Sequence, residues 1–129
     1  MLKELQKRFD TASLNYCDLH GLERDPDWVM LKLQEEIGEL TQVWNTKTGR
    51  GRAKGLSQSE LQQALSDEVA DALGMLLVFA HQHDLDLTRS IARKWRFDPS
   101  DLTTPTSASP DPRRTKCARI RPDTPWSRH

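Results

Sequence analysis

Apolar side chains recur through the first 97 residues of the chain at the three- and four-residue spacing of amphipathic helices. The first predicted helix extends from Leu2 to about Leu22, and Gly21 is the residue expected to end it. Its expected apolar stripe comprises Leu2, Leu5, Phe9, Ala12 and Tyr16. A stripe with this period is typical of a helix that buries one of its faces.

A second helix is predicted from about Pro26 to Thr46. Asp25 followed by Pro26 is typical of a helix start, because an aspartate can cap the free amides and proline suits the first helical position. The apolar stripe of this helix comprises Leu33, Ile37, Leu40 and Trp44. Residues 49–55, which are rich in glycine and basic side chains, then interrupt the pattern and are expected to form a flexible loop.

A third helix is expected to begin at Ser57 or Ser59, because Glu60 follows Ser57 at the spacing of a capping box. Its apolar stripe comprises Leu61, Leu65, Val69, Ala72, Leu76 and Phe79. The second half of the helix also carries apolar side chains outside this stripe, namely Met75, Leu77 and Val78. This distribution predicts burial on several sides, as at the centre of a bundle or in an oligomer interface.

A short fourth helix is predicted from about Asp86 to Phe97, with Asp86 or Thr88 as its cap. The helical pattern then stops, and residues 98–129 are rich in proline, serine and threonine, which predicts a disordered, mildly basic tail. No segment has the convincing alternation of a β-strand. We therefore predict an all-α fold, with residues 1–97 forming a bundle of three long helices and one short helix that oligomerises.

Composition and charge narrow the class of protein. The chain has 129 residues, enough for one domain, and its 19 basic and 19 acidic side chains give no reason to expect a stable nucleic-acid partner. No apolar run approaches the roughly 20 residues that span a bilayer, and the first residues lack the apolar stretch of a signal peptide. Cys17 and Cys117 have no spacing typical of a zinc site or a disulfide framework. A cytoplasmic protein without a membrane partner is expected.

Acidic residues on the two central predicted helices carry the main chemical signal. Glu35, Glu36 and Glu39 form an E-E-x-x-E pattern, and Glu68 and Asp71 form E-x-x-D. Residues three apart are neighbours on one helix face, so each pattern presents paired carboxylates beside an apolar stripe. If the two stripes pack together, the carboxylates converge at a high electrostatic cost that a divalent cation would remove. Oxygen-only ligation suits Mg²⁺ or Mn²⁺ rather than zinc. The ordinary alternative is a solvated acidic face.

These residues belong to two motifs that resemble those of a known family. The first motif reads Trp28-x-x-x-Lys32-Leu33-x-Glu35-Glu36-x-Gly38-Glu39-Leu40, and the second reads Leu65-Ser66-Asp67-Glu68-Val69-Ala70-Asp71-Ala72-Leu73. Together they resemble the paired motifs of the MazG-type, all-α nucleoside triphosphate pyrophosphohydrolases. Residues 84–87 and 91–94 are similar to the stretch that leads into the last helix of that family, so the resemblance covers about residues 25–97.

The resemblance implies hydrolysis of a nucleoside or deoxynucleoside triphosphate to the monophosphate and pyrophosphate. It also implies a Mg²⁺ cofactor, with Mn²⁺ as an alternative, and assembly into a homodimer or homotetramer. By position, the implied metal ligands are Glu36, Glu39, Glu68 and Asp71. Glu36 is also a catalytic residue in this assignment, and Glu35 would orient or deprotonate the attacking water.

Three further residues are implied to bind substrate. Lys32 and Lys94 are similar to family lysines that meet phosphate oxygens, although Lys32 could instead pair with Glu36 and Lys94 could be an ordinary surface charge. Trp28 lies away from the apolar stripe at the start of its helix and could stack on the nucleobase. Trp44, which lies on the stripe, is expected to be a core residue instead.

The segment after the last predicted helix departs from the family pattern. It reads Trp95-Arg96-Phe97-Asp98-Pro99, without the Asn and the Tyr-Pro that follow this helix in many relatives. This departure leaves a second hypothesis open, in which the chain is a non-catalytic helical oligomer that binds nucleotide or a protein partner.

Overall fold

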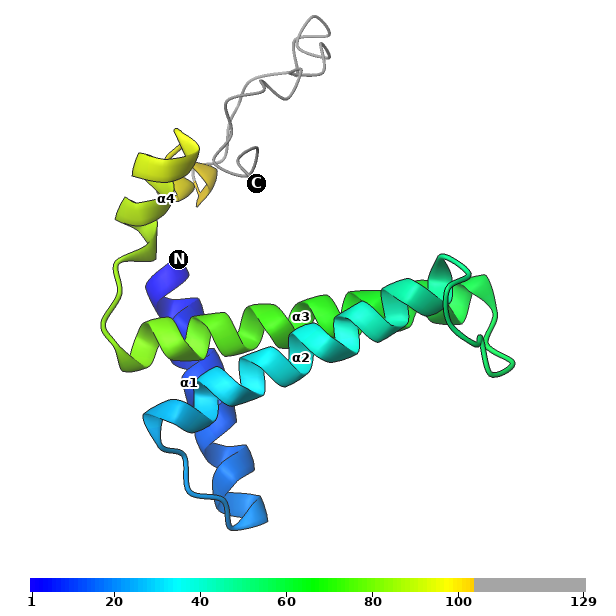
Figure 1. Cartoon of the computed structure of the whole chain (residues 1–129). Helices are drawn as coiled ribbons and strands as arrows, with labels where there is room; N and C mark the ends of the chain where they lie inside the picture. The colour runs from blue at the N-terminus through cyan, green and yellow to red at the C-terminus, as the bar shows by residue number, and fades with distance from the viewer. Residues whose placement is uncertain (104–129) are drawn as a thin grey trace, which may run out of the picture.

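The computed structural model describes residues 1–103, and this part of the chain is helical without a β-strand (Figure 1). The elements are α1 (Leu2–His20), α2 (Pro26–Lys47), α3 (Gln58–Gln82), α4 (Leu87–Trp95) and a 3₁₀ helix, η1 (Pro99–Thr103). The predicted all-α fold with three long helices and one short helix is therefore confirmed.

The order of the chain extends further than predicted. The disordered tail is predicted to begin at residue 98. In the structure, residues 99–103 form the 3₁₀ helix η1, and Pro99 is buried. The rest of the predicted tail, residues 104–129 with Cys117, lies outside the described residues. Among the residues that the structure does describe, no helix is long and apolar enough to cross a membrane.

The helix starts were predicted correctly because capping is decided by residues three positions apart. The Asp25 carboxylate accepts a hydrogen bond from the Trp28 amide at 2.7 Å, and Pro26 follows as the first helical residue. For α3 the cap is Ser57, whose hydroxyl and backbone form a complete capping box with Glu60. These local bonds fix where α2 and α3 begin.

The start of α4 and the end of α1 are also fixed by local interactions. The Asp86 carboxylate accepts a hydrogen bond from the Arg89 amide at 3.0 Å, so Asp86 rather than Thr88 caps α4. Helix α1 ends as expected at Gly21, which takes a left-handed conformation with φ of 63°. Glycine adopts this conformation without the steric penalty that a β-carbon brings.

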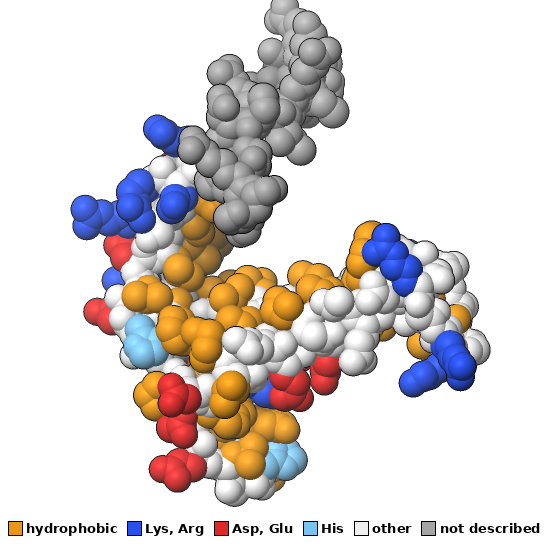
Figure 2. All heavy atoms as spheres, viewed as in Figure 1, with side chains coloured by type: hydrophobic (Ala, Val, Ile, Leu, Met, Phe, Trp, Pro, Cys, Tyr) orange, Lys and Arg blue, Asp and Glu red, His pale blue; other side chains and the backbone are white. Residues whose placement is uncertain are grey.

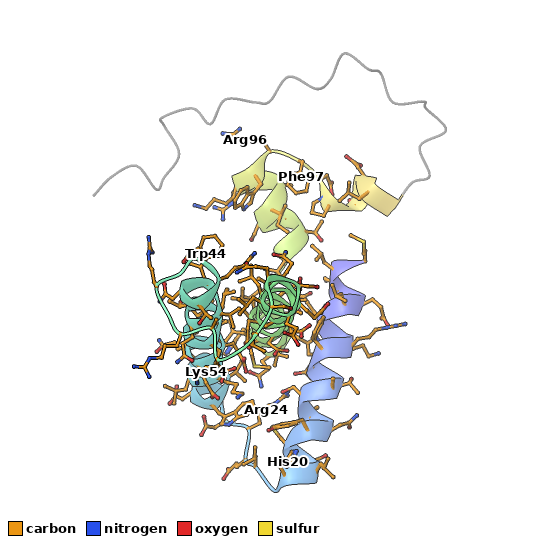
Figure 3. The ribbon with its side chains drawn as sticks, turned by 90° about the vertical axis from the view of Figure 1, so that its right-hand side faces the viewer. His20, Arg24, Trp44, Lys54, Arg96 and Phe97 are labelled. Atoms are coloured by element: carbon orange, nitrogen blue, oxygen red, sulfur yellow. The ribbon has the colours of Figure 1, made fainter. Side chains whose placement is uncertain are left out.

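Packing centres on α3. Helices α2 and α3 lie side by side as a hairpin, and α1 crosses α3 at the end of the hairpin remote from the loop between α2 and α3 (Figure 1). Viewed from the loop end, α1 and α2 lie on either side of α3, and α4 stands above them (Figure 3). Helix α4 packs mainly on η1 and makes little contact with the other helices. The most deeply buried large side chains are Val29 on α2 and Leu61 and Val78 on α3.

The packing face of α1 is turned by about one position from the predicted one, although Phe9 of the predicted stripe is partly buried and lies close to Gly74. Leu5 and Tyr16, which belong to the predicted stripe, are 37% and 49% exposed. The buried residues are instead Gln6, Asp10, Ser13 and Cys17. A mainly polar face is buried because specific partners hold it: Asp10 pairs with Arg24 at 2.9 Å, and the Gln6 amide donates to the Leu85 carbonyl at 3.4 Å.

The predicted stripes of α2 and α3 are also only partly buried. Five large apolar side chains of these stripes and their flanks are about half exposed, and we call them the open face: Ile37, Trp44, Val69, Leu73 and Leu76. Apolar side chains gather along the upper edge of the hairpin (Figure 2). Trp44 lies on the side of α2 nearer to α4 (Figure 3). The prediction that Trp44 is a core residue is therefore wrong for the single chain.

The crossing of α1 over α3 depends on the absence of a side chain at Gly74. A β-carbon built on Gly74 would lie 2.9 Å from the Phe9 ring, whereas one built on Gly38 in α2 would meet nothing within 4 Å. We expect Gly74→Ala to destabilise the protein by about 1–3 kcal/mol through overpacking. In a Phe9→Ala background the same change should become stabilising by about 1 kcal/mol, the helix preference of alanine over glycine.

The measurement is the free energy of unfolding in urea, followed by circular dichroism. Gly38→Ala is the matched control and should stabilise the protein by about 0.5–1 kcal/mol, because it gains helix preference without a clash. Equal effects of Gly74→Ala with and without Phe9 would contradict the close approach as the cause.

Candidate metal centre

Three carboxylates from the two central helices meet in one place. Oxygen atoms of Glu36, Glu39 and Glu68 all lie within 4.8 Å of one another. Glu36 and Glu39 are one turn apart on α2, and the side-by-side packing of α2 and α3 brings Glu68 against them. We call these three residues the acidic cluster.

Burial separates the acidic cluster from an ordinary solvated face. Glu36 is only 7% exposed. The Oε2 atom of Glu68 is buried and accepts no hydrogen bond from any residue within 1–103. Glu39 is exposed and leaves one side of the cluster open to solvent. Burying a carboxylate oxygen without a partner costs free energy, so the arrangement calls for a compensating charge.

Lys32 supplies part of that charge. Its Nζ atom lies 3.0 Å from Glu35 and 3.3 Å from Glu36, so it bridges the two carboxylates one turn along α2. Burial lowers the pKa of Lys32, but its hydrogen bonds to Glu35 and Glu36 and the negative charges of these two residues together outweigh that effect and leave the pKa raised. The ion pair with Glu36, one of the two alternatives for Lys32, is thus present, and it leaves Glu68 uncompensated.

Glu68 carries the electrostatic cost of the cluster. Burial raises the pKa of its carboxyl, and the neighbouring charges of Glu39, Asp71 and Glu36 raise it further. A raised pKa means that the folded protein holds a proton on Glu68 more tightly than the unfolded chain does. The ionised cluster therefore works against folding.

Asp71, the fourth predicted ligand, lies beside the cluster rather than within it. It is exposed and lines an adjoining cavity of about 230 Å³. Two other predicted residues, Lys32 and Trp28, line the same cavity together with Glu36. The structure thus brings the predicted substrate residues Lys32 and Trp28 next to the predicted ligands. Glu35 lies close to them because it forms an ion pair with Lys32.

The cavity also contains residues that sequence reasoning missed. Ser13 and Tyr16 reach it from α1, and Met75 reaches it from α3. Tyr16 was expected to belong to the packing stripe of α1, and nothing in the spacing distinguished Ser13 from a surface residue. Both depend on which face α1 turns toward the hairpin, which the repeat of apolar residues did not predict.

On each helix of the hairpin, an acidic residue of the candidate site and an apolar residue of the open face point in different directions. Residues two apart on a helix point in nearly opposite directions, and Glu39 is two positions from Ile37, as Asp71 is from Leu73. Acidic side chains appear along the lower edge of α2, away from α4 (Figure 2). Lys94 is exposed on α4, and it is not among the residues that line the cavity. The structure does not bring Lys94 to the cluster of its own chain.

The donor set fits a hard divalent cation. All three groups of the cluster are carboxylates, and the unpartnered oxygen of Glu68 offers a ready ligand. Mg²⁺ and Mn²⁺ prefer such oxygen donors, whereas zinc prefers nitrogen and sulfur. Comparison with known proteins finds no family model, no curated protein and no solved structure that matches this chain. The argument for function therefore rests on the residues themselves.

The raised pKa of Glu68 predicts how stability depends on pH. Between its ordinary value of 4.5 and the higher folded value, the folded protein binds more protons than the unfolded chain, so stability falls as pH rises through this window. We expect Glu68→Gln, which carries no charge, to raise the Tm at pH 7 in metal-free buffer. The gain should shrink toward pH 4, where Glu68 of the wild type is protonated.

Thermal unfolding by calorimetry, with chelator present, measures this effect. Glu23→Gln makes the same chemical change at an exposed residue of the loop between α1 and α2 and should leave the Tm almost unchanged. A Tm for Glu68→Gln that lies below the wild-type value at pH 7 would show that the cluster does not strain the fold.

Proposed function

We propose that the chain is a Mg²⁺-dependent pyrophosphohydrolase, with Mn²⁺ as a substitute, that converts nucleoside or deoxynucleoside triphosphates to the monophosphate and pyrophosphate. The observation that carries the proposal is the convergence of three carboxylates from α2 and α3 within 4.8 Å of one another. The adjoining cavity, lined by Lys32, Asp71 and Trp28, adds residues that suit a phosphate, a metal and a base. The motif resemblance of the two helices points to the same activity, and a cytoplasmic role in nucleotide housekeeping follows from it.

In this proposal Glu36, Glu39 and Glu68 hold the cation, and Asp71 completes the ligand set from the cavity side. When bound, the cation neutralises charge on the phosphate oxygens and lowers the pKa of a coordinated water. The unpartnered Oε2 atom of Glu68 and the clustered negative charge are the features that support this assignment. The ligands are held on two packed helices, so the site is largely formed in advance.

The reaction itself is the attack of water on the α-phosphorus. The new bond joins the water oxygen to the α-phosphorus, the bond to the oxygen bridging the α- and β-phosphates breaks, and pyrophosphate leaves with that oxygen. Glu35, which is exposed and next to the ligand Glu36, accepts the proton of the water. Lys32 exchanges part of its pairing with Glu35 and Glu36 for contacts with phosphate oxygens.

Pyrophosphate release from each common dNTP and NTP tests the proposal, with Mg²⁺ and then with Mn²⁺. We expect Glu36→Gln and Asp71→Asn each to lower kcat/KM by at least about 100-fold, since each removes charge that faces the metal or the transition state. Glu23→Gln, remote from the cluster, should retain activity. Helical content by circular dichroism should be the same in all variants.

Two results would count against this proposal. If no nucleotide is hydrolysed with either ion, the enzyme proposal fails. If Glu36→Gln retains full activity, the ligand assignment fails. The second candidate, a non-catalytic helical oligomer that binds nucleotide or a protein partner, would then gain support. The observation that favours this candidate is that α4, which carries Lys94, makes little contact with the other helices of its own chain.

The proposal includes assembly into a homodimer or homotetramer through the open face. Its members are about half exposed in the single chain, which is unusual for so many large apolar side chains on adjacent helices. A second copy of the hairpin would cover this face while leaving the acidic cluster on the other side accessible to substrate. The hairpins of the two copies would then form one helical bundle, to which each copy contributes α2 and α3.

Size-exclusion chromatography with light scattering tests the assembly. We expect the wild type to be a dimer or tetramer and Leu73→Glu to dissociate it, because a charge at this position would be buried in the interface. Leu19→Glu is the matched control: Leu19 is 81% exposed on α1, and its replacement should leave the mass unchanged. A monomeric wild type would contradict the proposed interface.

A further inference from the structure

The cavity beside the acidic cluster holds a polar group without a partner. Ser13 is only 7% exposed, and its hydroxyl forms no hydrogen bond with any residue of the described part of the chain. It lines the cavity from the face of α1 that turns toward the hairpin. Buried hydroxyls nearly always have a partner, so an orphan that borders a cavity is suited to a ligand atom.

The other walls of the cavity suit a flat ring. Tyr16 from α1 is about half exposed, Trp28 from α2 is half buried, and Met75 from α3 adds an apolar wall. Aromatic faces and a thioether stack readily on planar ligands, and stacking accepts every nucleobase because each has a π-face.

The size and position of the cavity limit what part of a ligand it holds. Its volume of about 230 Å³ lies below the usual range for a whole drug-sized ligand, so it accommodates a ring rather than an entire nucleotide. Glu36 and Asp71 border the same space, so a ligand seated here extends toward the acidic cluster. The phosphates and the ring of one ligand would then occupy adjoining regions.

We infer that this cavity binds the heteroaromatic base of the substrate and that the Ser13 hydroxyl hydrogen-bonds to the edge of the base. Stacking on Tyr16 and Trp28 supplies affinity for any base, whereas Ser13 discriminates between bases by the donor or acceptor that each presents. Ser13 is thus a specificity-determining residue outside both acidic motifs. The inference rests on the proposed function for the identity of the ligand.

Nucleosides without phosphates test the cavity apart from catalysis. Binding of each common nucleoside to the full chain is measured by saturation-transfer NMR in metal-free buffer. We expect one nucleoside to bind best, and Ser13→Ala to weaken that one by about threefold to tenfold, the range of one hydrogen bond. Trp28→Ala should weaken all nucleosides alike. Ser66→Ala, at an exposed serine of α3, should change nothing.

Two further measurements distinguish a binding role of Ser13 from a structural role, and failure of the cavity assignment from failure of the proposed reaction. Ser13→Ala should not lower the Tm, because the hydroxyl has no partner among residues 1–103, whereas a purely structural serine would lower it. If the wild type binds nucleosides but hydrolyses no nucleoside triphosphate, the cavity assignment is supported and only the proposed reaction is refuted. If no nucleoside binds, or if Ser13→Ala leaves the ranking of bases unchanged, the inference is overturned.

Discussion

The packing of α2 along α3 is the constraint on which the rest of the molecule depends. It aligns two short acidic patterns that are each unremarkable alone, and it sets oxygen atoms of Glu36, Glu39 and Glu68 within 4.8 Å of one another. The same packing has an electrostatic cost. It buries Glu68 next to other carboxylates, and both effects raise the pKa of Glu68. Lys32 relieves the repulsion only on the α2 side. Such unrelieved strain is commonly found where function rather than stability fixes the residues.

The accuracy of the sequence-based predictions follows the range of the interactions involved. Helix starts at Asp25, Ser57 and Asp86 depend on hydrogen bonds to amides three residues away, and all three were predictable. The face that α1 buries depends instead on the pairing of Asp10 with Arg24 and on the hydrogen bond from Gln6 to the Leu85 carbonyl. Partners 14 and 79 positions apart leave no periodic trace in the sequence, so the apolar repeat favoured a face turned by about one position.

In the candidate site, too, the relations within one helix were predictable and the relations between helices were not. The members of each acidic pair were predictable as neighbours, since a helix fixes the relation of residues three apart. Which members meet across two helices was not, and Asp71 lies beside the cluster rather than in it. The contributions of Ser13 and Tyr16 were unpredictable because they depend on the crossing of α1, and the position of Lys94 depends on α4, which packs on η1 instead of the hairpin.

The two sides of the hairpin suit two different tasks. On α2, Glu39 and Ile37 point in nearly opposite directions, and Asp71 and Leu73 do so on α3, so these acidic and apolar side chains face different surroundings. A second copy that covered the open face would bury apolar area without touching the carboxylates or the cavity next to them. It would also add rigidity to the two helices that carry the acidic cluster. Assembly and ligand binding would then be coupled through α2 and α3 rather than through direct contact.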